Sequence, residues 1–305
     1  MKPRLVWLLL CCIWGSTWLF IKLGLEDLPP FTFAGIRFVI AVIILGTIVA
    51  IRRLSLPKTS RDWVLLMVSG VLAFSVNYGL LFWGEQYISS GLAAVLQSTI
   101  PAFGLVIAHF YLPGEQMTPA KIMGIVLGVI GVAVIFSNQL DVAGPKALAG
   151  CAALIVSSMG AAYSNVLVKA YGKHLDPAIM AGGQMFFGMI PLLLIGIPWE
   201  GSPLNFNWTP MAVVSLFYLA ITGSVIAFLL YYWLVQNMDV TKTMLIALVT
   251  PVVAVTLGMI VLDEKLHLRT LLGGLMIISG IAIIVTRQVG KRVQGLKSKV
   301  QSPLT

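Results

Sequence analysis

Long apolar runs follow one another along almost the whole chain, and short segments between them hold most of the charged residues. A membrane-spanning helix needs about 20 mostly apolar residues. Barrel strands would instead alternate apolar and polar positions, which these runs do not. The pattern therefore predicts an all-α integral membrane protein with ten transmembrane helices, at roughly residues 5–24, 31–51, 63–84, 90–112, 117–137, 147–171, 177–198, 210–235, 241–262 and 268–286.

The second half of the sequence repeats the first. Lys22 and Lys169 are 147 residues apart, as are Pro30 and Pro177, and a shift of 147 to 150 residues also superposes several other pairs. These pairs are Arg37/Gln184, Trp83/Trp233, Pro101/Pro251, Gly124/Gly273 and Gly131/Gly280. Five spans per repeat is an odd number, so the second copy is expected to be inverted in the membrane. Inverted repeats of this kind are typical of secondary transporters.

The repeats set the expected domain boundaries. The first five-helix repeat covers 5–137 and the second covers 147–286, with a linker at 138–146 and a basic tail at 287–305. If the N-terminus is cytoplasmic, fifteen of the 20 Lys and Arg residues lie on the cytoplasmic side and four outside, leaving Arg37 within a span. The positive-inside rule then predicts cytoplasmic termini in a plasma or inner membrane.

Composition supports a lipid environment. The chain of 305 residues is 59% hydrophobic and 10% charged, with a mean hydropathy of +0.97, whereas soluble domains carry about 25% charged residues. The net charge of +9 lies in loops and the tail, so it indicates topology rather than nucleic-acid binding. The expected partners are the bilayer and a small-molecule substrate, and the protein is expected to be a monomer or homodimer.

Acidic residues are absent from the middle of every predicted span. All eleven lie at span ends or in loops, whereas a proton relay or a counter-ion for a cationic drug normally needs a carboxylate within the membrane. The sequence therefore favours a neutral, zwitterionic or anionic substrate, although Glu85 or Glu115 could still border a water-filled cavity.

Arg37 is the one charge well inside a span. It could bind a substrate carboxylate or act as a gate. Alternatively, it could extend to the outer headgroups, or pair with Glu85 or a backbone carbonyl. Lys22 and Lys169 lie near span ends, where extension toward the headgroups is expected.

Several polar and aromatic residues share helix faces at spacings of three, four and seven. A lipid-facing surface would not hold Asn and Gln, so these faces either line one cavity or form hydrogen bonds between helices. For tryptophans, packing or an interfacial belt is an equal alternative. The cavity candidates are Trp14, Thr17, Arg37, Asn77, Tyr78, Gln97, Tyr163, Asn165 and Gln184.

Proline and glycine mark two further features. Pro101 and Pro251 interrupt matching spans and are expected to be hinges rather than direct ligands. Small residues at spacings of three, four and seven predict close packing of the fifth and tenth helices, or a dimer face. These glycines are Gly124, Gly128, Gly131, Gly273 and Gly280.

Catalytic and metal-binding patterns are not found. The three cysteines lie in apolar runs, and the three histidines show no metal-ligand spacing. No Ser/His/Asp set lies at one membrane depth, and no nucleotide-binding loop is present. The sequence predicts no cofactor, and a membrane enzyme or scaffold is the least favoured alternative.

The motifs together resemble the EamA-type exporters of the drug/metabolite transporter superfamily. The resemblance covers nearly all of 5–286 and rests on Ile13-Trp-Gly-Ser-Thr17, Ala34-Gly-Ile-Arg37, Gly114-Glu115 and the duplicated proline and glycine positions. It implies two inverted five-helix repeats around a central cavity, and export of small metabolites, often amino acids. We therefore expect a non-enzymatic exporter of small amphipathic metabolites, with aromatic or bulky apolar amino acids favoured and drug efflux as the alternative.

Overall fold

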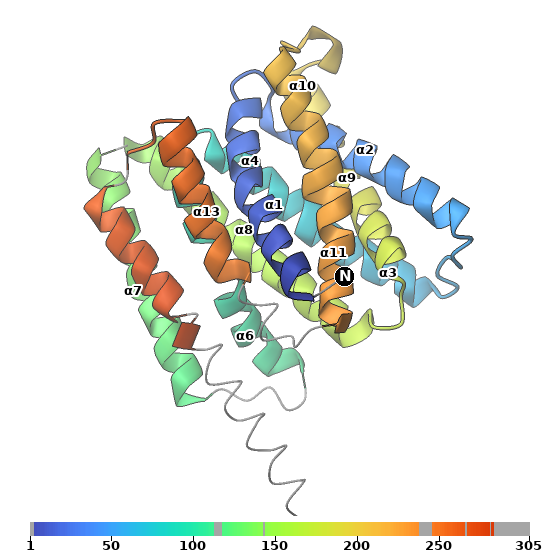
Figure 1. The fold of residues 1–305 in the computed structure, drawn as a ribbon, viewed down its shortest axis with the longest axis horizontal. Helices are drawn as coiled ribbons and strands as arrows, with labels where there is room; N and C mark the ends of the chain where they lie inside the picture. Colours follow the sequence, from blue (N-terminus) through green and yellow to red (C-terminus); the bar gives the residue numbers. More distant parts are fainter. Residues whose placement is uncertain are drawn as a thin grey trace, which may run out of the picture.

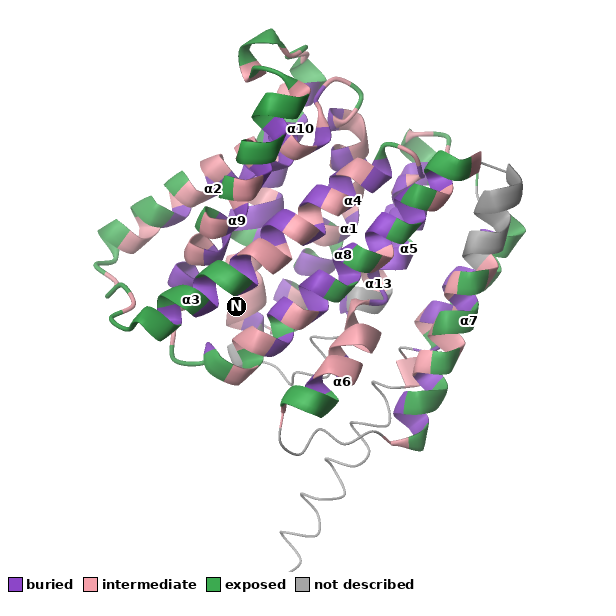
Figure 2. Cartoon of the chain, turned by 180° about the vertical axis from the view of Figure 1, so that it is seen from behind, coloured by how far each residue is buried: buried purple, intermediate pink, exposed green. Residues whose placement is uncertain are grey.

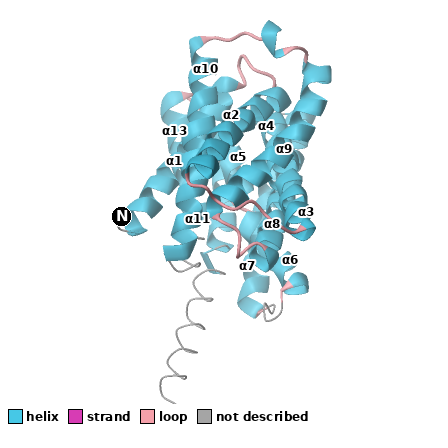
Figure 3. Cartoon of the chain, turned by 90° about the vertical axis from the view of Figure 1, so that its right-hand side faces the viewer, coloured by secondary structure: helices cyan, strands magenta, loops and turns pink. Residues whose placement is uncertain are grey.

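The computed structural model describes residues 3–112, 118–142, 144–237, 246–265, 267–280 and 282–283. Throughout these ranges the chain forms helices and short connections without strands (Figure 3). The predicted basic tail at 287–305 and Glu115 lie outside the described residues.

The first repeat forms five apolar spans. The third span is one continuous rod of three segments, and the fourth is divided in two. The elements are α1 (Pro3–Gly24), α2 (Pro30–Ile51), α3 (Ser60–Gly70) with η1 (Val71–Val76) and α4 (Asn77–Glu85), α5 (Ser90–Gln97) with α6 (Ile100–Tyr111), and α7 (Pro119–Val142).

The second repeat follows the same order. Its elements are α8 (Gly144–Tyr171), α9 (Pro177–Glu200), the short η2 (Pro203–Asn205), α10 (Pro210–Phe217) with η3 (Tyr218–Ile226) and α11 (Ala227–Asn237), α13 (Ile246–Val261) and a last helix at Leu268–Gly280. Seven described helices are long and apolar enough to cross a membrane, and three shorter apolar helices complete the set of ten. The predicted ten-helix fold is confirmed.

Helix contacts follow the repeat. α2 packs along α9, its own counterpart. α8 packs against α3, η1, α4 and α6, while α1 packs against their counterparts in the other repeat, α10, η3, α11 and α13. Each contact therefore recurs with the two repeats exchanged, as expected for a pseudo-twofold axis. Figure 1 shows α7 and the last helix side by side at one edge, with α1 in front of α8 near the centre of the view.

Both repeats contain a π-helix at the same place. η1 and η3 begin at Val71 and Tyr218, which are 147 residues apart, and each lies in the middle of its apolar rod. A π-helix widens the turn and frees carbonyl groups from the normal pattern, and such segments are frequent at functional sites. Both segments are apolar at most positions, so a local change of helical period leaves no mark in the hydropathy pattern.

The two proline positions differ in structure. Helix α5 ends at Gln97, and α6 begins at Ile100 with Pro101 in its first turn, so the fourth span is interrupted at Ser98–Thr99. Pro251 instead lies inside the continuous α13. Within the described residues, the interruption is therefore found in the first repeat only. Pro101 lies in a first turn, where proline is accommodated, whereas Pro251 removes a hydrogen bond inside α13.

The region predicted as a linker is largely helical. Helix α7 extends to Val142 and α8 begins at Gly144, whose φ of 75° lies in the left-handed region that glycine enters at little cost. Glycine thus accommodates the change of direction at this point, and the helices reach further into 138–146 than their hydropathy indicates.

Burial divides the helices into an interior and a surface set. Figure 2 shows exposed positions concentrated on α7, on α3 and on the far half of α2, while α1, α4, α5 and α8 carry long buried faces. The exposed set is rich in large apolar side chains, among them Leu194, Val129 and Leu275. Such a surface fits the hydrocarbon of a bilayer, which needs no polar covering.

Candidate functional site

Arg37 lies in the interior of the bundle. It is carried by α2, is 1% exposed, and faces η3 of the other repeat. Its Nε donates to Ser224 Oγ at 2.9 Å, and Nη2 approaches the carbonyl oxygen of Gly223 at 3.4 Å. Arg37 therefore does not extend to the headgroups and does not pair with Glu85. Of the partners expected from the sequence, only a backbone carbonyl is found, and it accepts from Nη2 alone.

The π-helix η3 creates the surface on which Arg37 rests. Ser224 Oγ donates to Leu219 O, five residues earlier, at 2.9 Å, which orients its oxygen toward Arg37. A β-carbon on Gly223 would lie 2.8 Å from Thr17 Cγ2 and 3.5 Å from Arg37 Nη2. Glycine at this position therefore lets α1, α2 and η3 meet closely enough for the contact.

Aromatic rings cover the other side of the guanidinium. Its carbon lies 4.8 Å from the centre of the Tyr78 ring, 5.2 Å from Phe38 and 5.9 Å from Phe82. Tyr78 in turn stacks on Phe74 with ring centres 5.8 Å apart. Cation–π contacts of this kind favour a cation by about 0.5–2 kcal/mol each and leave its N–H groups free to bind other partners.

The guanidinium keeps an unused donor. Nη1 is buried and has no hydrogen-bond partner among the described residues, and no described carboxylate pairs with Arg37. A buried charge without a counter-ion is costly, and in membrane proteins such residues usually mark a substrate or ion pathway. The site therefore offers a free, charged N–H group beside aromatic rings.

Gln184, the repeat counterpart of Arg37, is also buried. Its Nε2 donates to Ser69 Oγ at 2.9 Å, and its Oε1 accepts from Tyr232 Oη at 3.2 Å. Ser69 immediately precedes the last residue of α3, next to η1, so Gln184 faces the other π-helical rod as Arg37 faces η3. The two sites have the same framework, and only one of them carries a charge.

A second polar cluster, formed by Asn77, Gln97 and Ser157, lies next to the Arg37 site. Gln97 Nε2 donates to Asn77 Oδ1 at 3.1 Å and also contacts Ser157 Oγ. All three are buried, and Gln97 ends α5 just before the interruption at Ser98–Thr99. Asn77 is adjacent to Tyr78, which connects this group to the Arg37 site through α4. Here the observed contacts are hydrogen bonds between helices, the alternative that the sequence left open.

The remaining cavity candidates lie apart from Arg37 or at its margin. Thr17 is buried beside Gly223, and Trp14 packs against Phe228 and Tyr231 with ring centres 5.8 and 5.3 Å apart. Tyr163 donates to Tyr111 Oη at 2.8 Å. Asn165 is exposed and makes no hydrogen bond within the described part of the chain, so the structure does not bring it to the polar cluster.

Three carboxylates tie the repeats together at one end of the bundle. We name this end, which holds the connections 25–29, 86–89, 201–209 and 262–265 and which charge predicts to be extracellular, the outer face. Glu200 accepts from Phe31 N and Thr32 N at 2.8 and 2.7 Å, and Glu264 accepts from Ser90 N at 2.8 Å. Asp27 accepts from Asn207 Nδ2 and Thr209 Oγ1, both at 2.6 Å.

These contacts join opposite repeats in every case. Glutamates near the ends of α9 and α13 cap the starts of α2 and α5, where free N–H groups and the helix dipole favour a negative charge. With these contacts in place Arg37 is only 1% exposed, so solvent does not reach it from the outer face, and we call this arrangement closed at the outer face. The sequence places these acids in loops, but it contains no signal for their partners, which lie more than 160 residues away.

Lys22 and Glu85 lie just beneath this closure. The Lys22 ammonium donates to the carbonyl oxygens of Glu85 and Ile88 at 2.6 and 2.8 Å, so it is held by the end of α4 and does not extend to the headgroups as expected. The Glu85 side chain is 0% exposed.

The glycine-rich helices form a separate feature. A β-carbon on Gly131 would overlap the carbonyl oxygen of Gly273, and one on Gly280 would overlap that of Gly124, so α7 and the last helix approach backbone to backbone. A β-carbon on Gly128 would instead meet open space.

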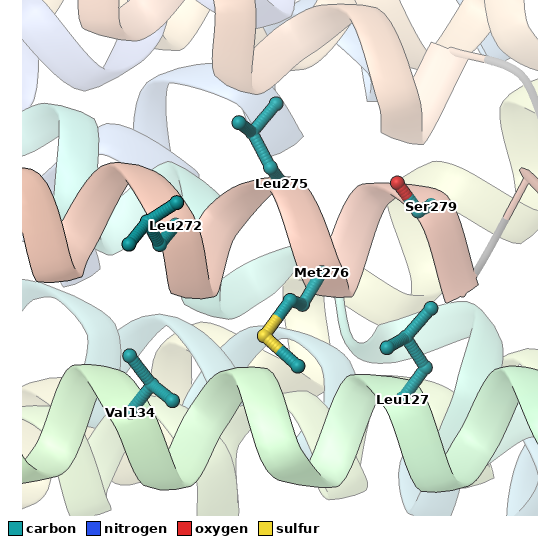
Figure 4. A pocket seen from close by; sticks show the side chains of 6 residues that line it. All are labelled: Leu127, Val134, Leu272, Leu275, Met276 and Ser279. Atoms are coloured by element: carbon teal, nitrogen blue, oxygen red, sulfur yellow. The ribbon is translucent and has the colours of Figure 1, made fainter.

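A cavity of about 420 Å³ lies between the same two helices. Figure 4 shows Met276 pointing from the last helix toward α7. Of the lining residues Leu127, Val134, Leu272, Leu275, Met276 and Ser279, only Ser279 is polar. A cavity with this lining suits acyl chains better than a polar solute, and none of its lining residues belongs to the Arg37 site.

Comparison with known proteins identifies the family twice along the chain. Residues 2–137 and 148–286 each match the EamA-like transporter family. The chain is 31% identical to the uncharacterized transporter YoaV of Bacillus subtilis over 88% of its length and 91% of the relative. It is also 31% identical to the uncharacterized inner membrane transporter YedA of Escherichia coli K12, over 81% of this chain and 78% of that one.

A relative and a solved structure extend the comparison. An uncharacterized transporter of Archaeoglobus fulgidus is 30% identical over 94% of this chain and all of its own length. A crystal structure superposes with a TM-score of 0.67 at 18% identity, covering 96% of this chain and 98% of that one, which supports the fold alone.

Proposed function

Because the chain belongs to the EamA-like transporter family and is a multi-pass membrane transporter, we propose that it exports small amphipathic metabolites bearing a carboxylate, amino acids foremost. Transport proceeds by alternating access: the two repeats rock about the interior site so that it opens first to one side and then to the other. The inter-repeat contacts at the outer face are broken in one half of this cycle.

The unused donor of Arg37 is the observation that carries the proposal. A carboxylate is the ligand that best matches a guanidinium, because two N–H groups can bind two oxygens in parallel. Nε is committed to Ser224, so Nη1, together with the weakly held Nη2, supplies the donors for the ligand. The aromatic rings stabilise the cation from its other side.

The surroundings of Arg37 support a particular kind of carboxylate. Tyr78, Phe38 and Phe82 form an aromatic wall on one side of the charge. Apolar and aromatic side chains of a substrate pack well on such a wall, and ring pairs add about 0.5–1.5 kcal/mol beyond area burial. This supports aromatic and bulky apolar amino acids over small polar ones.

Substitution of Arg37 tests the proposal. Arg37→Lys keeps the charge but loses the planar pair of donors, and Arg37→Gln loses the charge. Losing one charged hydrogen bond costs about 1.5–3 kcal/mol, so amino-acid counterflow should fall by about 10- to 100-fold in the glutamine variant, with a smaller loss in the lysine variant. Arg61→Gln, which removes an exposed arginine stacked on Tyr171, is the matched control. Undiminished counterflow in both Arg37 variants contradicts the assignment.

A further inference from the structure

Glu85 is a buried acid to which no described residue donates a hydrogen bond. It ends α4 and is 0% exposed, and neither carboxylate oxygen has a hydrogen-bond partner within the described residues. Burying an ionised carboxylate without donors is unfavourable, whereas the neutral acid is far less costly to bury. In the closed conformation, the neutral acid is therefore the form that this position stabilises.

A counter-ion lies close to Glu85 but is not bound to its carboxylate. The Lys22 ammonium spends two donors on the carbonyl oxygens of Glu85 and Ile88, at the C-terminal end of α4, where the helix dipole favours a cation. An ammonium has three donors. One therefore remains for the carboxylate once it ionises and turns toward Lys22.

The other charged groups around Glu85 come from separate elements. Glu264, which follows α13, binds Ser90 and Gly91 only a few residues beyond Glu85, and its negative charge opposes ionisation there. From α8, Lys146 stacks over the Tyr87 ring at 5.9 Å. On α4, Phe82 separates Glu85 from Arg37, since Tyr78, Phe82 and Glu85 lie on one helix face at spacings of four and three.

We propose that Glu85 binds a proton when the outer face closes and releases it when the outer face opens. On opening, the O–H bond of the acid breaks, the proton passes to the external water, and the carboxylate that remains pairs with Lys22. On closing, the carboxylate leaves Lys22 and takes up a proton from the external water. Proton uptake and release both occur at the outer face, so the cycle carries no net proton across the membrane.

The role of Glu85 in transport rests on the proposed function, but the proton site itself does not. Dicyclohexylcarbodiimide reacts with protonated carboxyl groups in apolar surroundings, so reconstituted protein is treated with it at external pH values from about 5 to about 9, around the ordinary range of a carboxyl group. Peptide mass spectrometry then reads out which residues are labelled. No substrate is needed.

Labelling at Glu85 should be highest at low pH and fall as the external pH rises, by about tenfold for each pH unit above the midpoint. Exposed Glu26, at the same face, is the matched control and should remain unlabelled. Lys22→Gln removes the counter-ion and should move the midpoint to higher pH. Glu85 that is unlabelled at every pH, or labelled equally throughout, overturns the proposal.

Glu85→Gln separates a proton site from a structural charge. The amide imitates the neutral acid, so the variant should unfold at the same temperature as the wild type. A fall of about tenfold or more in the ratio of folded to unfolded protein would show that the native group is ionised. In vesicles, solute counterflow should slow as external pH falls in the wild type and be slow at every pH in the variant. Counterflow that is pH-independent in both contradicts the coupling, and pH-dependent labelling without any solute movement contradicts only the transport function.

Discussion

Removing the Glu264 cap should open the outer face. Glu264 bridges the repeats, since its backbone N–H donates to Gly258 O on α13 at 3.1 Å while its carboxylate accepts from Ser90 N at 2.8 Å, Ser90 Oγ at 3.0 Å and Gly91 N at 3.3 Å. The turn that brings it there places Asp263 at a φ of 51°, a left-handed conformation that aspartate tolerates better than most residues. The carboxylate is thus held rigidly over the start of α5.

The magnitude follows from these contacts. Loss of a helix cap costs about 0.5–2 kcal/mol, and hydrogen bonds to a charged acceptor reach about 1.5–3 kcal/mol each. Taking about 2 kcal/mol for the loss of the whole side chain in Glu264→Ala, the ratio of open to closed outer face should rise about 30-fold. Glu264→Gln keeps one acceptor oxygen for Ser90 N and should raise the ratio by about tenfold or less.

The assay measures how fast a buried thiol becomes accessible from outside. Cys11, Cys12 and Cys151 are replaced, and Ile88, 5% exposed at the outer face, becomes the reporter cysteine. A membrane-impermeant maleimide is then added outside. Its rate of reaction with Ile88→Cys should be lowest with Glu264 in place, higher in Glu264→Gln and highest in Glu264→Ala. Glu26→Gln, which removes an exposed carboxylate that makes no described hydrogen bond, should leave the rate unchanged. Equal rates in all four proteins would refute the view that this cap closes the outer face.

Two further predictions use glycines as internal controls. Gly131→Ala places a β-carbon against the last helix and should lower stability by about 1–3 kcal/mol in thermal unfolding, whereas Gly128→Ala, which meets open space, should have little effect; equal melting temperatures contradict the close approach. Gly223→Ala presses on Thr17 and the Arg37 contact, so counterflow should fall at least about tenfold while Gly104→Ala, also in open space, retains it; retained counterflow in Gly223→Ala would contradict the role of η3.

Much of the architecture is readable in the sequence because a bilayer imposes a simple rule. Each apolar run of about 20 residues must be a helix, so the ten spans follow, and the spacing of Pro101 and Pro251 reveals the repeat. Arg37 is identified by the same rule, since a charge inside an apolar run must find an interior environment. The sequence left open whether Arg37 extends to the headgroups, and the structure buries both Arg37 and its counterpart Gln184.

The details of the site depend on features that hydropathy does not encode. The π-helix η3 presents Gly223 and Ser224 to Arg37, but its sequence is apolar at most positions, so hydropathy does not show the change of helical period. The partners of Glu200 and Glu264 are set by tertiary contact between repeats. Asn165 is eight residues from Ser157, about 80° around the helix, so it lies at the edge of the polar face, where the structure leaves it exposed.

Counterflow of matched solutes tests the central claim most directly. Wild-type protein in proteoliposomes is loaded with an unlabelled aromatic amino acid, and uptake of the labelled amino acid is compared with uptake of the corresponding amine, which lacks only the carboxylate. From the proposed role of Arg37, whose Nη1 has no described partner, we expect saturable counterflow of the amino acid and at least about tenfold less of the amine. Equal movement of both, or movement of the cationic amine alone, would contradict carboxylate recognition and favour drug efflux.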